Sequence, residues 1–533
     1  MIKKLFNSQT KTITSAAIII GAASLLSRLL GVLRDRVLAG EFGAGPNLDM
    51  YYAAFRIPDM VFNLLVLGAI SAGFIPVFTE YLKNKKKAWE LVNIILNVLL
   101  LALILISGLL ILIAPWLVKI IAPGFDKEQI AITADLTRIM FMSPIFLCVS
   151  GILGGILQSF KRFFIYSIAP ILYNIGIIIG ALFFVPFLGI YGLAWGVALG
   201  SFMHMIIQIP TTTALGYQYQ WIIDLKNHGF SKILKMMVPR ILGLVTSQIN
   251  FIVITIIGST LMAGSITIFN LANNLQSFPL GIFGVSFAIA VFPTLSTLAK
   301  KKGDFIHTLS LTARQILFFI IPTSALLIIL RAQIVRIVLG SGLFDWQDTI
   351  LTLRTLSLFS ISLFAQALIL LFARAFYALQ DSKTPFYTGL ISVFANIILA
   401  LMTVEELGVA GLALAFSLSS VLNLVLSYLA LHYKIGNLDG TKIVISTSKI
   451  LVATFMLAIV SQATKYVIEP IFGTQTFIGI ASQGIISASA GLLVYFIICW
   501  LLKAEELNYL IDSFKKRMLK KITPPVEAIE KNT

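Results

Sequence analysis

The chain consists almost entirely of apolar segments about as long as a bilayer is thick, separated by short polar stretches. A helix needs about 20 residues to cross the hydrocarbon core, so each segment is long enough to span a membrane. Only helices and closed barrels satisfy their backbone groups in lipid, and these runs far exceed the alternating segments of about ten residues typical of barrel strands. The sequence therefore predicts an all-α polytopic membrane protein.

We expect about fourteen transmembrane helices, with ends uncertain by several residues. Hydrophobic residues make up 58% of the chain and charged residues 12%, against about 25% charged in soluble domains. The first span follows a basic N-terminus, but it has no small-residue cleavage site at its end, so we interpret it as an uncleaved span. The predicted spans are 13–38, 50–82, 90–120, 130–158, 163–186, 190–213, 232–262, 265–299, 306–331, 348–378, 385–403, 408–433, 443–468 and 475–502.

Lysine and arginine alternate between the two sides of the predicted membrane. The loops after even-numbered spans are basic, as in 83–87 and 300–302, whereas the opposite loops are poor in positive charge. The positive-inside rule then places both termini in the cytoplasm and the protein in the cell membrane. The net charge of +17 could also indicate nucleic-acid binding. Clusters spread over many short loops favour orientation and contact with lipid headgroups instead.

Three pairs of segments recur at offsets near 220 residues. LGIYGLAWGVALGS at 188–201 is similar to 407–420, 157–174 to 379–396, and 73–87 to 290–303; the second pair aligns Asn174 with Asn396. Parallel repeats of six spans are a transporter architecture, so we expect two six-helix lobes around a central cavity. The predicted parts are an N-lobe at 1–213, a linker at 214–231, a C-lobe at 232–433, two further helices at 443–502 and a basic cytoplasmic tail at 503–533.

Motifs for covalent chemistry or nucleotide binding are missing from the sequence. It has no GxxxxGK[ST], HExxH or GxSxG segment, and its four histidines have no metal-ligand spacing. Cys148 and Cys499 lie in apolar stretches and predict neither a disulfide nor a metal site. We therefore expect no enzyme, no metal and no cofactor. A membrane transferase is the weaker alternative, because the acidic residues lie mostly in loops.

Arg28 lies inside the first predicted span, where a charge costs roughly 2.5–3.5 kcal/mol on insertion scales. At helical spacing it shares a small, polar face with Gly21, Ser24 and Gly31, which favours the interior of a bundle over lipid. The alternative is an arginine that extends to the membrane surface from near a helix end. An arginine on such a face is suited to hold an anionic group that must cross.

Charged residues in and between the first two spans are the remaining site candidates. Arg34 and Asp35 could form a structural ion pair or take part in coupling, and both possibilities stay open. Several of the later arginines fall near predicted span ends and are interpreted as headgroup anchors. The first-span and second-span candidates are Arg28, Arg34, Asp35, Asp49, Arg56 and Asp59.

The stretch SRLLGVLRDRVLAGEFGAGPNLDMYYAAFRIPD at 27–59 resembles the start of the MurJ/MviN family, the lipid II flippases of the multidrug/oligosaccharidyl-lipid/polysaccharide exporter superfamily. GAISAGFIPVFTEY at 68–81, APGF at 122–125, APILYN at 169–174 and FYALQDSKTP at 376–385 fit the same family in order. The resemblance implies fourteen helices, a central cationic cavity, and a groove for the lipid tail formed by the last two helices. It implies transfer of undecaprenyl-diphosphate-linked peptidoglycan precursor from the inner to the outer leaflet.

The resemblance also assigns binding residues. Arg28, Arg34 and Asp35 align with the cavity residues of the family, and Arg56 aligns with a basic position in the second span. Asp49 and Asn274 complete the predicted substrate-binding set. The chain departs from the family at Phe62, Asn63 and Leu67, where an arginine pair and a glutamate are usual, and at Asn273 and Asn274, which replace Asp-Arg. The cavity should therefore be less cationic than in other members.

Four functions remain open from the sequence. The leading hypothesis is a lipid II flippase that works by alternating access, with membrane lipids as neighbours, an unknown coupling ion and a monomeric state. A flippase for another polyprenyl-diphosphate-linked glycan is second, and a cation-coupled exporter of the same superfamily is third. A non-transporting scaffold in cell-wall assembly is disfavoured, because a scaffold has no use for arginine in the membrane.

Overall fold

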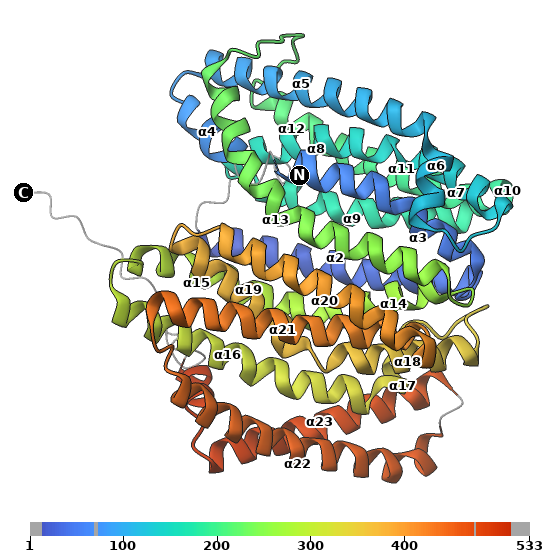
Figure 1. The fold of residues 1–533 in the computed structure, drawn as a ribbon, viewed down its shortest axis with the longest axis vertical. Helices are drawn as coiled ribbons and strands as arrows, with labels where there is room; N and C mark the ends of the chain where they lie inside the picture. The colour runs from blue at the N-terminus through green and yellow to red at the C-terminus, as the bar shows by residue number, and fades with distance from the viewer. Residues whose placement is uncertain (1–12, 69–72, 474–475, 513–533) are drawn as a thin grey trace, which may run out of the picture. The chain divides into compact units, whose positions relative to one another are not determined.

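The computed structural model describes residues 13–68, 73–473 and 476–512, and in these ranges it contains helices and turns but no strand. Figure 1 shows the helices joined by short connections. The lysines at positions 3, 4 and 11 lie outside the described residues, and so does the predicted basic tail beyond residue 512. The all-helical membrane class is confirmed.

The helices follow in chain order, with three π-helical segments labelled η. The first part has α2 (Ile13–Phe42), α3 (Pro46–Val61), η1 (Phe62–Leu67), α4 (Ile75–Tyr81), α5 (Lys85–Leu112), α6 (Ala114–Ile121), α7 (Lys127–Met140), α8 (Met142–Ser159), α9 (Phe163–Ile179), η3 (Gly180–Phe184), α10 (Val185–Leu188), α11 (Tyr191–Ile206) and α12 (Ile209–Ala214). The second part has α13 (His228–Ser259), α14 (Ser265–Pro279), η4 (Leu280–Val285), α15 (Ser286–Leu298), α16 (Lys302–Ile329), α17 (Arg331–Val338), α18 (Trp346–Ser360), α19 (Leu363–Ala378), α20 (Lys383–Leu407), α21 (Val409–Ile435), α22 (Gly440–Phe472) and α23 (Phe477–Leu501).

Eleven helices among the described residues are long and apolar enough to cross a membrane, and two bent pairs raise the number to as many as 13. One bent pair is α18 with α19, which meet at 47°. All of these coincide with predicted spans. The remaining predicted span, 13–38, overlaps α2, which is not among the eleven. The predicted count of about fourteen is therefore not confirmed.

Contacts divide the chain into two compact units, which we describe separately. Unit 1 comprises Met1–Phe278, Val338–Phe359 and Ser382–Leu422, and unit 2 comprises Pro279–Ile337, Ser360–Asp381 and Asn423–Thr533. The units do not follow the predicted boundary at 214–231. The division into two lobes remains a prediction.

In unit 1, small residues let helices approach closely. α11 packs against α9 and η3, and α9 packs in turn against α2. A Cβ atom added to Gly176 would lie 2.2 Å from the Cα atom of Gly200, and one added to Gly180 would lie 2.4 Å from the Cα atom of Gly196. Helices in lipid gain no hydrophobic driving force from association and rely on such close van der Waals packing. The glycines at positions 192, 196 and 200 therefore lie at a helix interface.

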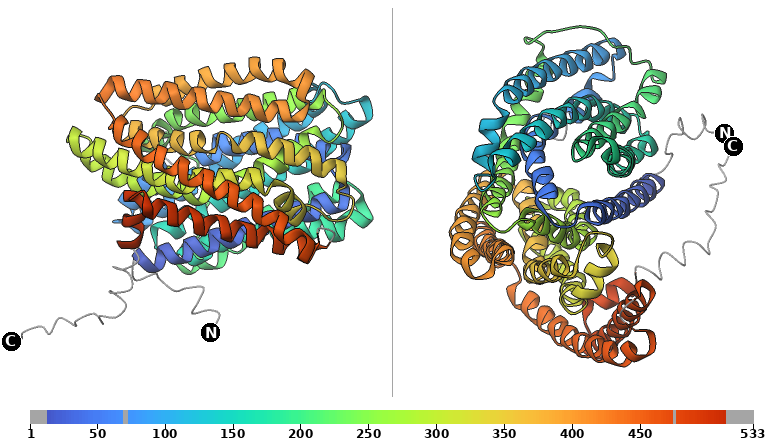
Figure 2. Two further views of the ribbon diagram at one scale, coloured as in Figure 1. Left: turned by 90° about the horizontal axis from the view of Figure 1, so that it is seen from below. Right: turned by 90° about the vertical axis from the view of Figure 1, so that its right-hand side faces the viewer.

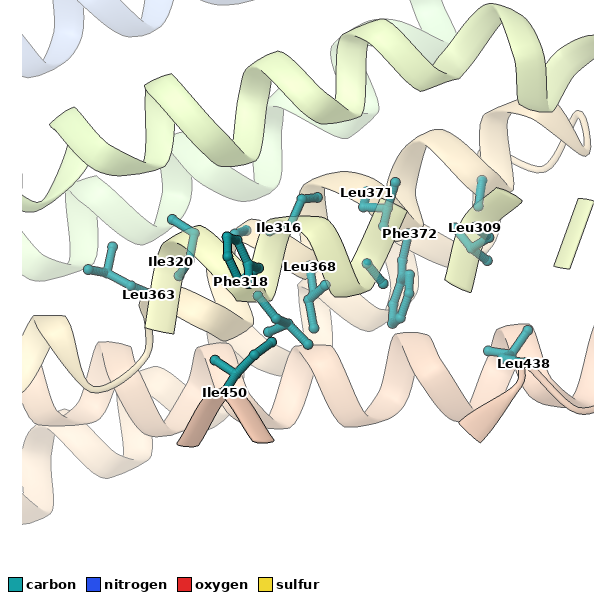
Figure 3. Packing of buried hydrophobic residues seen from close by; sticks show 14 of the residues in the cluster. Leu309, Ile316, Phe318, Ile320, Leu363, Leu368, Leu371, Phe372, Leu438 and Ile450 are labelled. Carbon is teal, nitrogen blue, oxygen red and sulfur yellow. The ribbon is translucent and has the colours of Figure 1, made fainter. Parts of the chain in front are cut away.

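Unit 2 is built around α16. Buried residues of α16, α19 and α22 form one apolar cluster, which includes Phe318, Leu371 and Ile450 (Figure 3). α22 and α23 lie side by side, as Figures 1 and 2 show. The hydroxyl of Tyr495 on α23 donates a 2.7 Å hydrogen bond to the carbonyl of Phe318. Packing and this interhelical hydrogen bond together attach the last helix pair to α16.

Backbone geometry repeats along the chain at an offset of 219 residues. Lys161 and Gln380 both have φ near +58°, and Gly189 and Gly408 both have φ near +57°. Lys161 and Gln380 lie in the α8–α9 and α19–α20 connections, and Gly189 and Gly408 directly follow α10 and α20. This offset corrects the sequence alignment of Asn174 with Asn396 by three residues, since 222 positions separate those two. The asparagines share a helix face but differ by nearly one turn.

Candidate functional site

Arg34 lies on α2, eight residues before its end. Its Nε and Nη2 atoms donate to Oδ1 of Asp35 at 3.0 and 2.8 Å, and Nη1 donates to Oδ1 of Asn174 on α9 at 3.2 Å. The Arg34 side chain keeps 22% of its surface exposed, whereas Asp35 keeps 7%. The arginine is thus held on two sides but not enclosed.

Asp35 connects α2 to α14. Its Oδ1 atom accepts from Arg34, and its Oδ2 atom accepts a 2.9 Å hydrogen bond from Nδ2 of Asn274. Three of the predicted site residues therefore form one network. The ion pair between Arg34 and Asp35, left open by the sequence, is present in the structure.

The donor count of Arg34 shows what the network can still bind. A guanidinium carries five N–H groups in a planar fork. Asp35 and Asn174 take three of them, so one hydrogen on Nη1 and one on Nη2 have no partner among the described residues. One N–H on each terminal nitrogen is therefore left for a phosphate group, which arginine can bind through two N–H groups.

Arg28 lies nearer the middle of α2, about 9 Å from Arg34 along the helix axis. Its side chain is half-buried and makes no hydrogen bond or ion pair with the described part of the chain. Neither direct contact with Arg34 nor contact with Asp35 occurs. The structure therefore does not test the predicted role of Arg28. No carboxylate among the described residues pairs with its charge.

Arg56 on α3 is more constrained than the sequence predicts. Its Nε atom donates to the hydroxyl of Thr255 and its Nη2 atom to Oδ1 of Asn270, both at 2.8 Å. Its guanidinium carbon also lies 5.4 Å from the ring centre of Phe251. Arg56 therefore joins α3 to α13 and α14 and does not meet Arg34. Its three other donor hydrogens have no partner within the described ranges of the chain.

Asp49 is placed for a structural task. It is buried near the start of α3, where its carboxylate accepts from the backbone N–H of Gly264 and from both the backbone N–H and the hydroxyl of Thr267, each at 2.7 Å. These are the first donors of α14, which a helix cannot satisfy by itself. A carboxylate there also interacts favourably with the helix dipole. The structure thus offers a helix-capping role for this predicted binding residue.

Two asparagines of the network were not predicted as site residues. Asn174 appears in the sequence only as a repeat marker, and Asn270 was not singled out. Asn270 and Asn274 are four residues apart on α14, so they lie on one helix face and contact different charged residues. Two asparagines at this spacing in an apolar helix would have been a usable signal.

The positions that depart from the family pattern carry uncharged residues. Phe62, Asn63 and Leu67 lie in η1, and Nδ2 of Asn63 donates to the backbone carbonyl of Asp59 at 2.8 Å.

Cys148 and Cys499 are buried free cysteines. No group of three His, Cys, Asp or Glu residues that could hold a metal ion occurs in the part of the chain that the structure covers.

A seam of close backbone contacts lies beyond the end of α2. The N–H of Leu343 donates to the carbonyl of Gly40 at 2.8 Å, and a Cβ atom on Gly342 would lie 2.1 Å from that oxygen. A Cβ atom on Gly264 would lie 2.1 Å from the carbonyl oxygen of Ala44. Gly342 and Gly264 have φ of +57° and +90°, which other residues rarely adopt. We call these two contacts the glycine seam.

Comparisons with known proteins agree on one family. The family model for the lipid II flippase MurJ matches residues 38–481. The chain is 30% identical over 430 residues to the probable lipid II flippase MurJ of Buchnera aphidicola subsp. Schizaphis graminum, covering 79% of this chain and 84% of the relative. It is 31% identical over 438 residues to that of Vibrio cholerae, covering 79% and 83%.

Solved structures show the same similarity. A structure titled lipid II flippase MurJ, inward closed conformation, superposes with a TM-score of 0.75 at 25% identity and covers 91% of this chain and 98% of that chain. An inward-facing multidrug resistance MATE family transporter of the MOP superfamily superposes with a TM-score of 0.64 at 13% identity, covering 80% and 99%. The second similarity concerns the fold alone.

Proposed function

This chain belongs to the MurJ family of lipid II flippases, and on that premise we propose that it moves lipid II across the membrane. Lipid II has a polar glycopeptide head joined by a diphosphate to a long polyprenyl tail. The tail can remain in the bilayer while the head crosses through the protein. The protein therefore has to hold an anionic group away from bulk water.

The observation that carries this proposal is the unfinished coordination of Arg34. Its two unpartnered N–H groups are charge-assisted donors, and such donors bind phosphate oxygens about twice as strongly as neutral ones. Asp35 pairs with the guanidinium, while Arg28 supplies a second cation on the same helix. We propose that Arg34 and Arg28 bind the diphosphate. Arg56 contributes through its remaining donors.

Alternating access requires contacts that can close one end of the protein and later part. The glycine seam joins Gly40 and Ala44, at and just beyond the end of α2, to Gly342, Leu343 and Gly264, which belong to the other predicted lobe. Beside it, Oδ2 of Asp348 accepts a 2.9 Å hydrogen bond from the N–H of Ala44. These polar and backbone contacts can separate without breaking an apolar core. Asp49 would leave the first turn of α14 in the same step. The membrane potential, worth about 2.3 kcal/mol per charge per 100 mV, could supply the energy.

The chain is a multi-pass membrane protein of a transporter family. We propose that it works in the cytoplasmic membrane as a monomer with both termini inside, because basic loops follow every second span. We also propose that it performs transport without covalent chemistry. No coupling ion is assigned.

Another polyprenyl-diphosphate-linked glycan is the second candidate cargo, although the relatives named above are lipid II flippases. Asn274 contacts Asp35 where other family members tend to have arginine, so the site has one cation fewer beside the diphosphate. A different polyprenyl-diphosphate-linked glycan would share the same anionic group. The two cargoes differ only in the head that must pass.

Complementation tests the proposal. The wild-type chain should restore growth of cells depleted of their own lipid II flippase, and the Arg34→Ala and Arg28→Ala variants should not. The Cys148→Ala variant, a change in a buried apolar position, serves as the control and should still support growth. Full growth with both arginine variants would contradict the site. Failure of the wild-type chain, despite normal amounts in the membrane, would favour the second cargo.

A further inference from the structure

Asn174 on α9 has a fixed orientation beside Arg34. Its Nδ2 atom donates to the backbone carbonyls of Ser27 at 3.3 Å and of Pro170 at 3.1 Å. An amide nitrogen that faces two carbonyl oxygens cannot be exchanged with its oxygen without losing both hydrogen bonds. The Oδ1 atom of Asn174 must therefore face Nη1 of Arg34, as observed.

This orientation matters because one carboxylate alone does not fix a guanidinium. Asp35 contacts Arg34 through a single oxygen, Oδ1, while its other oxygen accepts from Asn274. Two donors that meet one oxygen leave the guanidinium free to tilt about that point. Asn174 supplies a second point of attachment on the opposite nitrogen, Nη1. Together, the two contacts define the direction of the remaining donors.

We propose that Asn174 is a positioning residue, whose carboxamide oxygen holds the Arg34 guanidinium with its two unpartnered N–H groups directed at the diphosphate of the cargo. The inference rests on the proposed function for the identity of the anion. It adds a residue outside the predicted site, and it assigns to that residue no contact with the cargo.

The chain offers a matched control in Asn396. Asn396 lies on α20, the corresponding helix of the second predicted repeat, and its Nδ2 atom donates to Oδ1 of Asn250 on α13. Asn174 and Asn396 are 8% and 2% exposed, so both are buried asparagines between helices. Their partners differ, since one asparagine contacts a cation and the other contacts a neutral amide. A purely structural role predicts the same consequences for both substitutions.

The experiment is a double-mutant cycle on the purified full-length protein in detergent, with undecaprenyl diphosphate as the probe and its Kd as the readout. Asn174→Ala should weaken binding about tenfold, the size expected for a hydrogen bond to a charged group. In the Arg34→Ala background the same substitution should change the Kd by less than twofold. Asn396→Ala should leave the Kd within twofold of the wild-type value. If Asn174→Ala does not fold, the near-isosteric Asn174→Leu replaces it.

Two results would overturn the inference. One is an unchanged Kd for a folded Asn174 variant. The other is an Asn174 effect that persists at full size when Arg34 is absent, because positioning acts only through Arg34. These outcomes can be distinguished from the outcomes that concern the identity of the cargo. A wild-type chain that binds undecaprenyl diphosphate in an Asn174-dependent way but fails to complement would contradict lipid II transport and keep this inference.

Discussion

Two arginines of this protein occupy predicted membrane spans and have opposite surroundings. Arg34 on α2 pairs with one carboxylate and keeps 22% of its side chain exposed. Arg314 on α16 keeps 6% exposed and pairs with two carboxylates, Glu505 at 2.7 Å and Glu506 at 3.0 Å. Glu506 also accepts from the hydroxyl of Ser446 on α22. Arg314 thereby joins α16 and α22 to the segment after α23.

The difference shows that an arginine within a span is not by itself a binding residue. The charge of Arg314 is compensated within the protein, so that residue has a structural role. Arg34 shares its single carboxylate with Asn274, and its side chain is more exposed than that of Arg314. Arg314, one of the later arginines, is buried and is not a headgroup anchor. Side-chain exposure and the number of paired carboxylates, and not depth in the membrane, separate the two arginines.

The largest expected effect on stability comes from Arg314. Arg314→Ala leaves Glu506 buried at 3% exposure without its cation, and removing one partner of a buried ion pair costs about 3–5 kcal/mol. We expect a strongly lowered Tm and little protein in the membrane, as measured by thermal unfolding in detergent and by quantitative blotting. Arg28→Ala breaks no ion pair with the described residues, so it is the control and should unfold within a few degrees of the wild-type protein. Equal destabilisation by both variants would show that loss of the Arg314 ion pairs is not what lowers the stability.

A substitution at Asn274 should strengthen anion binding at the Arg34 site, in contrast to the loss of stability expected for Arg314→Ala. Asn274→Arg places a second guanidinium beside Oδ2 of Asp35 and restores the charge that is usual in the family. The added cation should tighten undecaprenyl diphosphate binding about tenfold, since a charge-assisted hydrogen bond is worth roughly 1.5–3 kcal/mol. Asn273→Arg, the neighbouring substitution, should have a smaller effect because the sequence places it on a different side of α14. Unchanged affinity for Asn274→Arg would argue against an anion site beside Asp35.

The smallest expected effect concerns Glu505. Its hydrogen bond to Arg314, and the charge of that arginine, hold the pKa of Glu505 below the usual value of 4.5. A lowered folded-state pKa contributes stability above the unfolded-state pKa, and this contribution disappears as the pH falls through the folded-state pKa. Because the side chain is 67% exposed, the contribution should be at most about 0.5 kcal/mol. Unfolding of wild-type protein and Glu505→Gln at pH 7 and pH 3.5 measures it. A larger gap between the two at pH 3.5 than at pH 7 would contradict the sign.

The architecture was largely predictable from the sequence, because apolar length and basic loops follow from the bilayer itself. The helix at 385–403 and its neighbours coincide with structural spans. The bend between Ser360 and Leu363 was not predictable, since no proline or glycine marks it in the sequence. The offset of 219 was predicted by the pair 188–201 and 407–420 but not by the pair 157–174 and 379–396. Identical letters aligned Asn174 with Asn396, whereas backbone torsion angles, which the letters do not encode, give 219.

The sequence predicted only those site residues that their charge or their family position marks individually. Arg34, Asp35 and Asn274 were singled out as charged or family positions, and they form one network. The partners of Arg56 come from α13 and α14, so they depend on how distant segments pack. Asn174 was missed for the same reason. Its importance comes from an arginine 140 residues away, and the sequence alone does not show that the two meet.

The most direct test of the central claim compares two lipids that differ by one phosphate. We would measure the Kd of the purified protein for undecaprenyl diphosphate and for undecaprenyl monophosphate, with the wild-type chain, Arg34→Lys and Arg34→Ala. Two neighbouring donors on Arg34 predict that the wild-type chain prefers the diphosphate, and that Arg34→Lys and Arg34→Ala reduce that preference in turn. Equal Kd values for the two lipids in the wild-type chain, or a preference unaffected by Arg34→Ala, would contradict the account.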